Sequence, residues 1–215
     1  MEIDHIFIFS NKKGIEADDL VEFGFTEGVS RVHPGQGTTN RKFYFENFFL
    51  EILWVISEKE IQSEVTAKTK LWERSQFQKN RHSRFGLCLV NSESTDELFQ
   101  QSEVYQPDYF PKGMSIDIIT NEICPKLPWT FRLPYRGKTK EHSEPTEHPN
   151  GIQSLTKAIF EYPMENDHLD FVQYFRAVDT LQFRNTKRTH LNLEFDNNGQ
   201  GKSKEFDELN LTINY

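Results

Sequence analysis

The chain has 215 residues, of which 36% are hydrophobic and 13% aromatic, and its formal net charge is −8. Its 19 phenylalanines can bury enough apolar surface for a folded core, which excludes a disordered polymer. The negative charge argues against nucleic acid as a partner, and the absence of an apolar run of about 18 residues argues against a membrane partner.

The start of the chain is acidic and lacks the positively charged region of a secretory signal. The two cysteines, Cys88 and Cys124, do not form the Cys-x-x-Cys pairs of metal or redox motifs. We therefore expect reduced thiols and a cytoplasmic protein.

The beginning of the chain predicts the order strand, helix, strand, strand, strand. In the opening strand, side chains alternate between a face that carries His5 and a face that carries Asp4. Both faces are largely apolar, which is typical of a strand covered on both sides. The predicted elements are a strand at 3–9, a helix from Ala17 that ends just before Gly24, a short strand at 25–30, a loop at 33–40, and a hairpin of strands at 42–46 and 48–55.

The order of a strand, a helix and further strands returns twice along the chain. The predicted elements are strands at 85–90, 114–119 and 129–133 with a helix from Ser94, and strands at 152–162, 181–184, 190–195 and 209–213 with a helix at 167–178. We predict an α+β fold of repeated βαβββ modules that form a cupped mixed sheet. Residues 1–135 are the paired core, 136–148 a charged linker, and 149–215 a third βαβββ-like module packed on the core.

A carboxylate stands in the middle of the apolar strand at 48–55. Glu51 lies between Leu50 and Ile52, and a buried, unpaired charge there would be expensive. Glu51 is therefore either a functional group that faces a site or one partner of a buried salt bridge with an arginine. The sequence leaves both explanations open.

Six segments, in this order, carry a family resemblance: Asp4-His5-Ile6-Phe7-Ile8, Phe23-Gly24-Phe25, His33-Pro34-Gly35-Gln36-Gly37-Thr38, Leu50-Glu51-Ile52-Leu53-Trp54, Phe85-Gly86-Leu87-Cys88-Leu89 and His148-Pro149-Asn150-Gly151. With them the chain resembles the vicinal-oxygen-chelate superfamily, which includes glyoxalase I, extradiol dioxygenases and bleomycin resistance proteins. More narrowly, it resembles the glyoxalase-like-domain branch. The resemblance implies paired βαβββ modules around a pocket.

The resemblance also implies a set of site residues. By position, His5 and Glu51 would be catalytic residues and ligands of one divalent metal ion, such as Zn, Ni, Mn or Fe. In the second module the corresponding positions hold Arg84 and Arg132, which have no lone pair to donate. These arginines would instead bind an anionic part of the substrate, with Glu51 as a metal-free general base.

Two further residues are predicted to contact the substrate. His33 opens a Pro-Gly-x-Gly loop, although it equally fits a surface turn, and Asn40 borders the next strand. Together these residues predict a glyoxalase-like small-molecule enzyme, a lyase or isomerase, that acts on an oxygen-bearing, anionic substrate in the cup. The alternatives are a non-catalytic binding or resistance-type protein without a metal, and a protein that acts through its acidic surface. A homodimer is compatible with all three.

Overall fold

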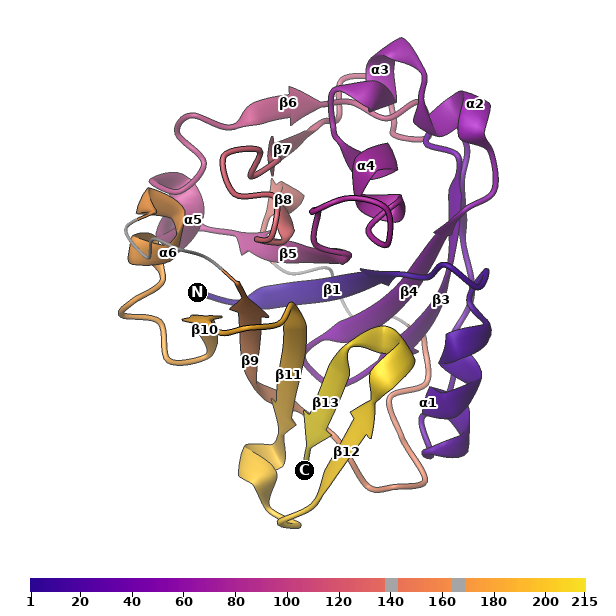
Figure 1. The fold of residues 1–215 in the computed structure, drawn as a ribbon, viewed down its shortest axis with the longest axis vertical. Coiled ribbons are helices and arrows are strands. Elements are labelled where there is room, and N and C mark those ends of the chain that lie inside the picture. The colour runs from indigo at the N-terminus through magenta and orange to yellow at the C-terminus, as the bar shows by residue number, and fades with distance from the viewer. Residues whose placement is uncertain (138–142, 164–168) are drawn as a thin grey trace.

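The computed structural model describes residues 1–137, 143–163 and 169–215, and their strands form two mixed sheets (Figure 1). The first sheet has the order β2-β3-β4-β1-β5-β8-β7-β6 and the second the order β10-β9-β11-β13-β12. The strands of the first sheet are β1 (Ile3–Phe9), β2 (Val32–His33), β3 (Thr38–Tyr44), β4 (Phe49–Val55), β5 (Phe85–Asn91), β6 (Glu103–Tyr105), β7 (Ile116–Ile119) and β8 (Trp129–Arg136). Those of the second are β9 (Leu155–Tyr162), β10 (Leu181–Asn185), β11 (His190–Phe195), β12 (Ser203–Phe206) and β13 (Leu211–Asn214).

The helices are short, and the predicted α+β class is confirmed. Within the described ranges, no helix has the length and apolar composition needed to cross a bilayer. The α-helices are α1 (Asp18–Glu22), α2 (Glu58–Ile61), α3 (Glu64–Ala67), α4 (Leu71–Ser75), α5 (Glu93–Asp96) and α6 (Asp170–Tyr174). Three 3-10 turns are η1 (Ile15–Ala17), η2 (Asp196–Asn198) and η3 (Asp207–Leu209).

The eight-stranded sheet curls into a half-barrel (Figure 1). At its centre β1 runs parallel to β4 on one side and antiparallel to β5 on the other. Strands β2 and β6 stand at opposite ends of the strand order. Even so, the Tyr109 hydroxyl, from the loop after β6, donates a hydrogen bond of 3.3 Å to Gln36 in the turn after β2. The two sheet edges therefore approach each other and enclose the concave side.

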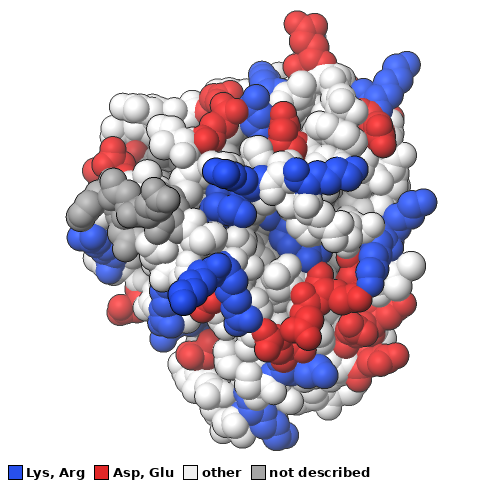
Figure 2. Space-filling view, viewed as in Figure 1, with Lys and Arg blue, Asp and Glu red and all other residues white. Residues whose placement is uncertain are grey.

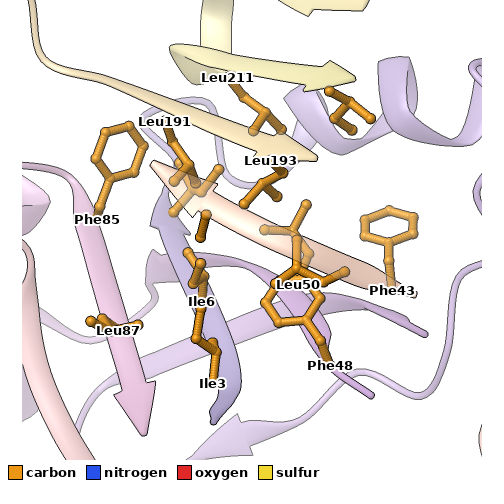
Figure 3. Packing of buried hydrophobic residues seen from close by; sticks show 14 of the residues in the cluster. Ile3, Ile6, Phe43, Phe48, Leu50, Phe85, Leu87, Leu191, Leu193 and Leu211 are labelled. Carbon is orange, nitrogen blue, oxygen red and sulfur yellow. The ribbon is translucent and has the colours of Figure 1, made fainter. Parts of the chain in front are cut away.

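The convex side of the curled sheet packs against the second sheet. Figure 3 shows Ile6 of β1 and Leu50 of β4 pointing toward Leu191 and Leu193 of β11, and all four side chains are buried in one core. Burial of each such side chain contributes roughly 1.5–3 kcal/mol. This second layer explains why both faces of β1 are apolar, as the sequence predicts.

The concave side holds a second, smaller core. Phe7 and Phe9 of β1 pack with Leu53, and α2 and α4 add Ile61 and Leu71. The segment that contains α2, α3 and α4 thus fills one end of the half-barrel. Phe7 also requires a glycine on the neighbouring strand, because a Cβ at Gly86 would lie 2.0 Å from the Phe7 ring.

The pairing of β1 with β5 is irregular near its start. Ile3 pairs with Leu89 and His5 with Cys88, so that one residue, Asp4, is extra on β1. A bulge of this kind redirects a side chain from its alternating position. Strict alternation predicts Asp4 on the face opposite His5, and this is wrong, because both residues line the concave side.

Several element boundaries differ from the sequence prediction. The strand expected at 25–30 is reduced to a bridge between Glu27 and Phe43, and β3 begins at Thr38, inside the expected loop. Strands β6 and β12 have no counterpart among the predicted strands. In the last segment the expected strands are present as β9, β10, β11 and β13. Of the helix expected at 167–178, residues 167 and 168 lie outside the described ranges, and α6 covers a shorter part. Strand β9 lies between β10 and β11, whereas β1 lies beside the last strand of its own segment, β4.

The expected charged linker spans 136–148; its residues 138–142 lie outside the described ranges, and its end is packed against the first sheet. His148 is 7% exposed. Its Nδ1 accepts from the Thr26 amide, and its Nε2 donates to the Tyr44 carbonyl, both at 2.9 Å. This arrangement requires the neutral ring, and burial lowers the pKa of His148.

We expect the protein to lose stability as the pH falls below about 6.5, the ordinary value for histidine. Because the pKa of His148 is lower in the folded state, the unfolded chain binds the proton first as the pH decreases. The free energy of unfolding therefore decreases as the pH decreases. Burial also lowers the pKa of His33 and His190. Urea denaturation at several pH values checks this. In His148→Gln, the free energy of unfolding is expected to change less steeply with pH. An equal slope in both proteins would contradict the assignment.

Candidate functional site

A cavity of about 410 Å³ lies on the concave side of the eight-stranded sheet. Its volume is within the range of about 300–1,000 Å³ that is usual for small-molecule sites. Strands β1, β3, β4 and β8 and the loop around Tyr109 line it. The cavity brings together four predicted site residues from separate elements: His5, His33, Asn40 and Glu51.

His5 is held between a carboxylate and two aromatic rings. Its Nδ1 lies 2.7 Å from Asp4 Oδ2, and its ring stacks on Phe49 with centroids 4.2 Å apart. The ring of Phe131 meets it edge-on at 5.3 Å. Because the Asp4 carboxylate can only accept, Nδ1 carries the proton, and Nε2 faces Glu51 with its lone pair when the ring is neutral.

Glu51 is buried, and Asn40 donates a hydrogen bond to only one of its two carboxylate oxygens. The Asn40 side-chain NH2 donates to Glu51 Oε1 at 2.5 Å, while Asn40 Oδ1 accepts from the Arg31 amide at 2.7 Å. That backbone contact fixes the orientation of the Asn40 amide. The other oxygen, Oε2, lies 3.9 Å from His5 Nε2. This separation is too long for a hydrogen bond, is compatible with an ion bound by both atoms, and is short enough for one substrate beside the pair to contact both.

The environment of Glu51 rules out one of the two explanations that the sequence left open. Among the described residues, the ionisable partner of Glu51 within 4.0 Å is His5 and not an arginine. A buried structural salt bridge with arginine is therefore not the reason for this carboxylate.

His33 is buried in a hydrogen-bonded chain at the edge of the cavity. Tyr109 donates to Gln36, Gln36 Nε2 donates to Thr38 Oγ1 at 2.8 Å, and Thr38 Oγ1 lies 2.9 Å from His33 Nδ1. Because the Thr38 hydroxyl accepts from Gln36, its own proton is free for His33. The alternative of a surface turn is wrong for His33, and burial lowers its pKa.

The structure does not bring Arg84 into the cavity, so its predicted contact with substrate is wrong. Its side chain is 3% exposed and donates to the carbonyls of Phe9 and Glu208. The Glu16 carboxylate lies 3.9 Å from it. Arg84 therefore ties the end of β1 to the turn before β13, and burial lowers its pKa to about 10.

Arg132 also lies away from the cavity, and its predicted role is likewise wrong. It donates to Asp117 and Asp96, both at 2.8 Å. Its neighbour Phe131 occupies the cavity wall instead. Since side chains alternate along a strand, placing Phe131 inward turns Arg132 outward.

The β8 side of the cavity is apolar. Trp129, Phe131 and Leu133 line it, and Phe131 is the register partner of Cys88 on β5. Where the family resemblance implies ligands from a second module, β8 presents rings and an aliphatic side chain, and the Cys88 thiol of β5 is fully buried outside the cavity lining. The polar groups of the cavity thus come mainly from β1, β3 and β4.

Sequence reasoning missed further polar residues of the cavity, among them Asp4, Arg31, Gln36, Lys42 and Tyr109. Lys42 stands two residues after Asn40 on β3, so period-two alternation could have placed it on the same face. Burial lowers the pKa of Lys42, against the opposing effect of Glu51. No local pattern indicates Tyr109, because its loop reaches the cavity from the opposite edge of the sheet.

The donor groups fit a divalent cation in two ways. Asp4, His5 and Cys88 place an oxygen, a nitrogen and a sulfur within 4.8 Å of one another. The expected pair, His5 Nε2 and Glu51 Oε2, is 3.9 Å apart. Two ligands at about 2.1 Å from one ion are at most ~4.2 Å apart, so this pair is compatible with a shared ion.

No family model matches the chain, and no curated protein matches its sequence. A solved structure of a hypothetical protein from Staphylococcus aureus is similar, with 13% identity, a TM-score of 0.51, and coverage of 99% of this chain and 98% of that chain. The hypothetical protein BH1468 from Bacillus halodurans C-125 has 14% identity and a TM-score of 0.39, over 67% of this chain and 98% of that chain. The first likeness shows a shared fold over nearly the whole chain.

Proposed function

We propose that this protein is a glyoxalase-like small-molecule enzyme of the vicinal-oxygen-chelate type, a lyase or isomerase that moves a proton on an oxygen-bearing substrate. The strand pairing supports the fold part of this proposal. The last strand of the first segment, β4, runs parallel beside β1, and the last strand of the second, β8, runs parallel beside β5. Each segment has its helix after the first strand, so both have the order of a βαβββ module.

The observation that carries the proposal is the facing pair of His5 and Glu51. Asn40 holds one oxygen of Glu51, which directs the other toward His5 across a gap of 3.9 Å. Two groups that exchange protons with one bound substrate are what an isomerase or lyase needs. Glu51 takes a proton from a carbon next to a carbonyl, and the imidazolium form of His5, held by Asp4 at Nδ1, gives its Nε2 proton to the carbonyl oxygen, so that an enol forms. The reverse transfers return the proton to carbon and restore both side chains.

A divalent ion is compatible with the same residues. Bound by His5 with Glu51, or by His5 with Asp4 and Cys88, it would polarise a substrate oxygen. We expect protein purified without chelator to contain one equivalent of a transition metal and to unfold at a lower temperature after EDTA treatment. Elemental analysis with thermal denaturation checks this, and a metal-free protein whose melting temperature EDTA leaves unchanged would contradict it.

The second candidate is a metal-free binding protein that holds a small ligand without catalysis. The apolar β8 wall favours it, because Trp129, Phe131 and Leu133 offer contact area but no ionisable group. A role through an acidic surface has less support. Figure 2 shows acidic and basic side chains mixed over the face in view, although the net charge is −8.

Isotope exchange separates the enzyme from the binding protein. For a ligand that binds in the cavity and has a hydrogen next to a carbonyl, such as phenylpyruvate, the enzyme exchanges that hydrogen for deuterium in deuterium oxide faster than buffer does. Exchange is measured by proton NMR of the ligand. Binding without exchange above the buffer rate would reject catalysis and favour the second candidate.

A further inference from the structure

The two cations of the cavity are not neutralised by carboxylates. Among the residues that the structure describes, neither the Arg31 guanidinium nor the Lys42 ammonium has a carboxylate oxygen within 4.0 Å. Each lies over a tyrosine ring instead: Arg31 is 5.3 Å from the ring centre of Tyr109, and Lys42 is 5.2 Å from that of Tyr44.

The nearby carboxylates are already engaged elsewhere. Asp4 accepts from His5, and Glu51 accepts from Asn40. Glu51 is also the register partner of Lys42 across β3 and β4, so it lowers the positive potential there without forming a close ion pair. Glu144, which acts on the Lys42 charge from farther away, accepts from the Val29 amide.

The opposite wall carries an unsatisfied donor within an apolar surface. Trp129 is 3% exposed, and its indole N–H has no hydrogen-bond partner in the described part of the chain. A buried donor without a partner costs about 1–3 kcal/mol. The rings of Trp129 and Phe131, 4.8 Å apart, add a surface that suits an apolar or aromatic group.

From these three features we infer that the cavity takes an amphipathic organic carboxylate, with its anionic group at Arg31 and Lys42 and its apolar or aromatic body against Trp129 and Phe131. The volume of about 410 Å³ suits a single-ring acid. This inference names the substrate class of the site proposed above and rests on the same cavity, but binding does not require catalysis. It also moves the expected anion site from Arg84 and Arg132 to β3 and the segment before β2.

The test compares two probes of the same shape and different charge, hydrocinnamate and its neutral amide. We expect hydrocinnamate to bind at least tenfold more tightly, because a carboxylate makes charge-assisted hydrogen bonds with both cations. Arg31→Gln and Lys42→Met should each remove most of this preference while the amide binds as before. Binding is measured by isothermal titration calorimetry, and circular dichroism checks the fold of each variant.

A matched control is Arg188→Gln, which removes an exposed arginine from the second sheet. It should leave the affinity for both probes unchanged. Equal binding of hydrocinnamate and its amide to the wild-type protein would overturn the inference, as would an undiminished preference in both Arg31→Gln and Lys42→Met. Arg31 is exposed, so Arg31→Gln remains informative if Lys42→Met fails to fold. If the protein prefers hydrocinnamate to its amide but catalyses no isotope exchange, the proposed enzyme function is rejected and this inference is retained.

Discussion

Replacement of Glu51 by glutamine is expected to reduce catalysed isotope exchange by at least about a hundredfold, the usual effect of losing a general base. Glutamine keeps the size of the side chain and its oxygen can still accept from Asn40, so the wall of the cavity is preserved. It cannot take a proton from the substrate. Ligand affinity should therefore change much less than the exchange rate, which proton NMR and calorimetry measure on the same samples.

A matched control for this variant is Glu161→Gln. Glu161 is a half-buried carboxylate of β9 that accepts from Asn192, outside the cavity. It should retain the wild-type exchange rate. If Glu51→Gln also retains that rate while folded, Glu51 is not the base and the proposed chemistry is wrong.

Replacement of Arg84 by methionine is expected to lower the free energy of unfolding by about 3 kcal/mol, since removal of one member of a buried charge cluster leaves the other uncompensated. The uncompensated group is Glu16, which is 2% exposed and otherwise accepts from the Ser10 hydroxyl and the Asn11 amide. The carbonyls of Phe9 and Glu208 also lose their donor. Urea denaturation measures the change.

The same variant distinguishes the structural role of Arg84 from a role in substrate binding. Affinity for hydrocinnamate should remain at the wild-type value below the unfolding transition, because Arg84 does not line the cavity. The control is Arg132→Met, because Arg132 was predicted together with Arg84 to bind the anionic part of the substrate. Its ion pairs with Asp96 and Asp117 are partly exposed, so the loss of stability should be about 1 kcal/mol or less. Weaker ligand binding in Arg84→Met would contradict the structural role.

The half of the site on β1, β3 and β4 could be predicted from the sequence for a simple reason. Period-two alternation puts Glu51 on a face of its own strand, and an isolated carboxylate in an apolar strand indicates that this face holds either a site or a buried ion pair. The family resemblance then links Glu51 to His5, which the alternation of a single strand cannot do. The structure places these two residues in one cavity with Asn40 and His33.

The other half could not be predicted, because it depends on register and loop geometry. A shift of one residue exchanges the two faces of a strand, and this is the difference between Phe131 and Arg132 on β8. The bulge at Asp4 breaks alternation without a local signal. Tyr109 reaches Gln36 only because the sheet curls, which is a property of the whole chain.

The most direct test of the account is the fate of the hydrogen next to the carbonyl when phenylpyruvate is bound by the wild-type protein in deuterium oxide. We predict exchange at least tenfold faster than in buffer, and its loss in Glu51→Gln. Saturating binding with exchange at the buffer rate would contradict proton transfer by His5 and Glu51.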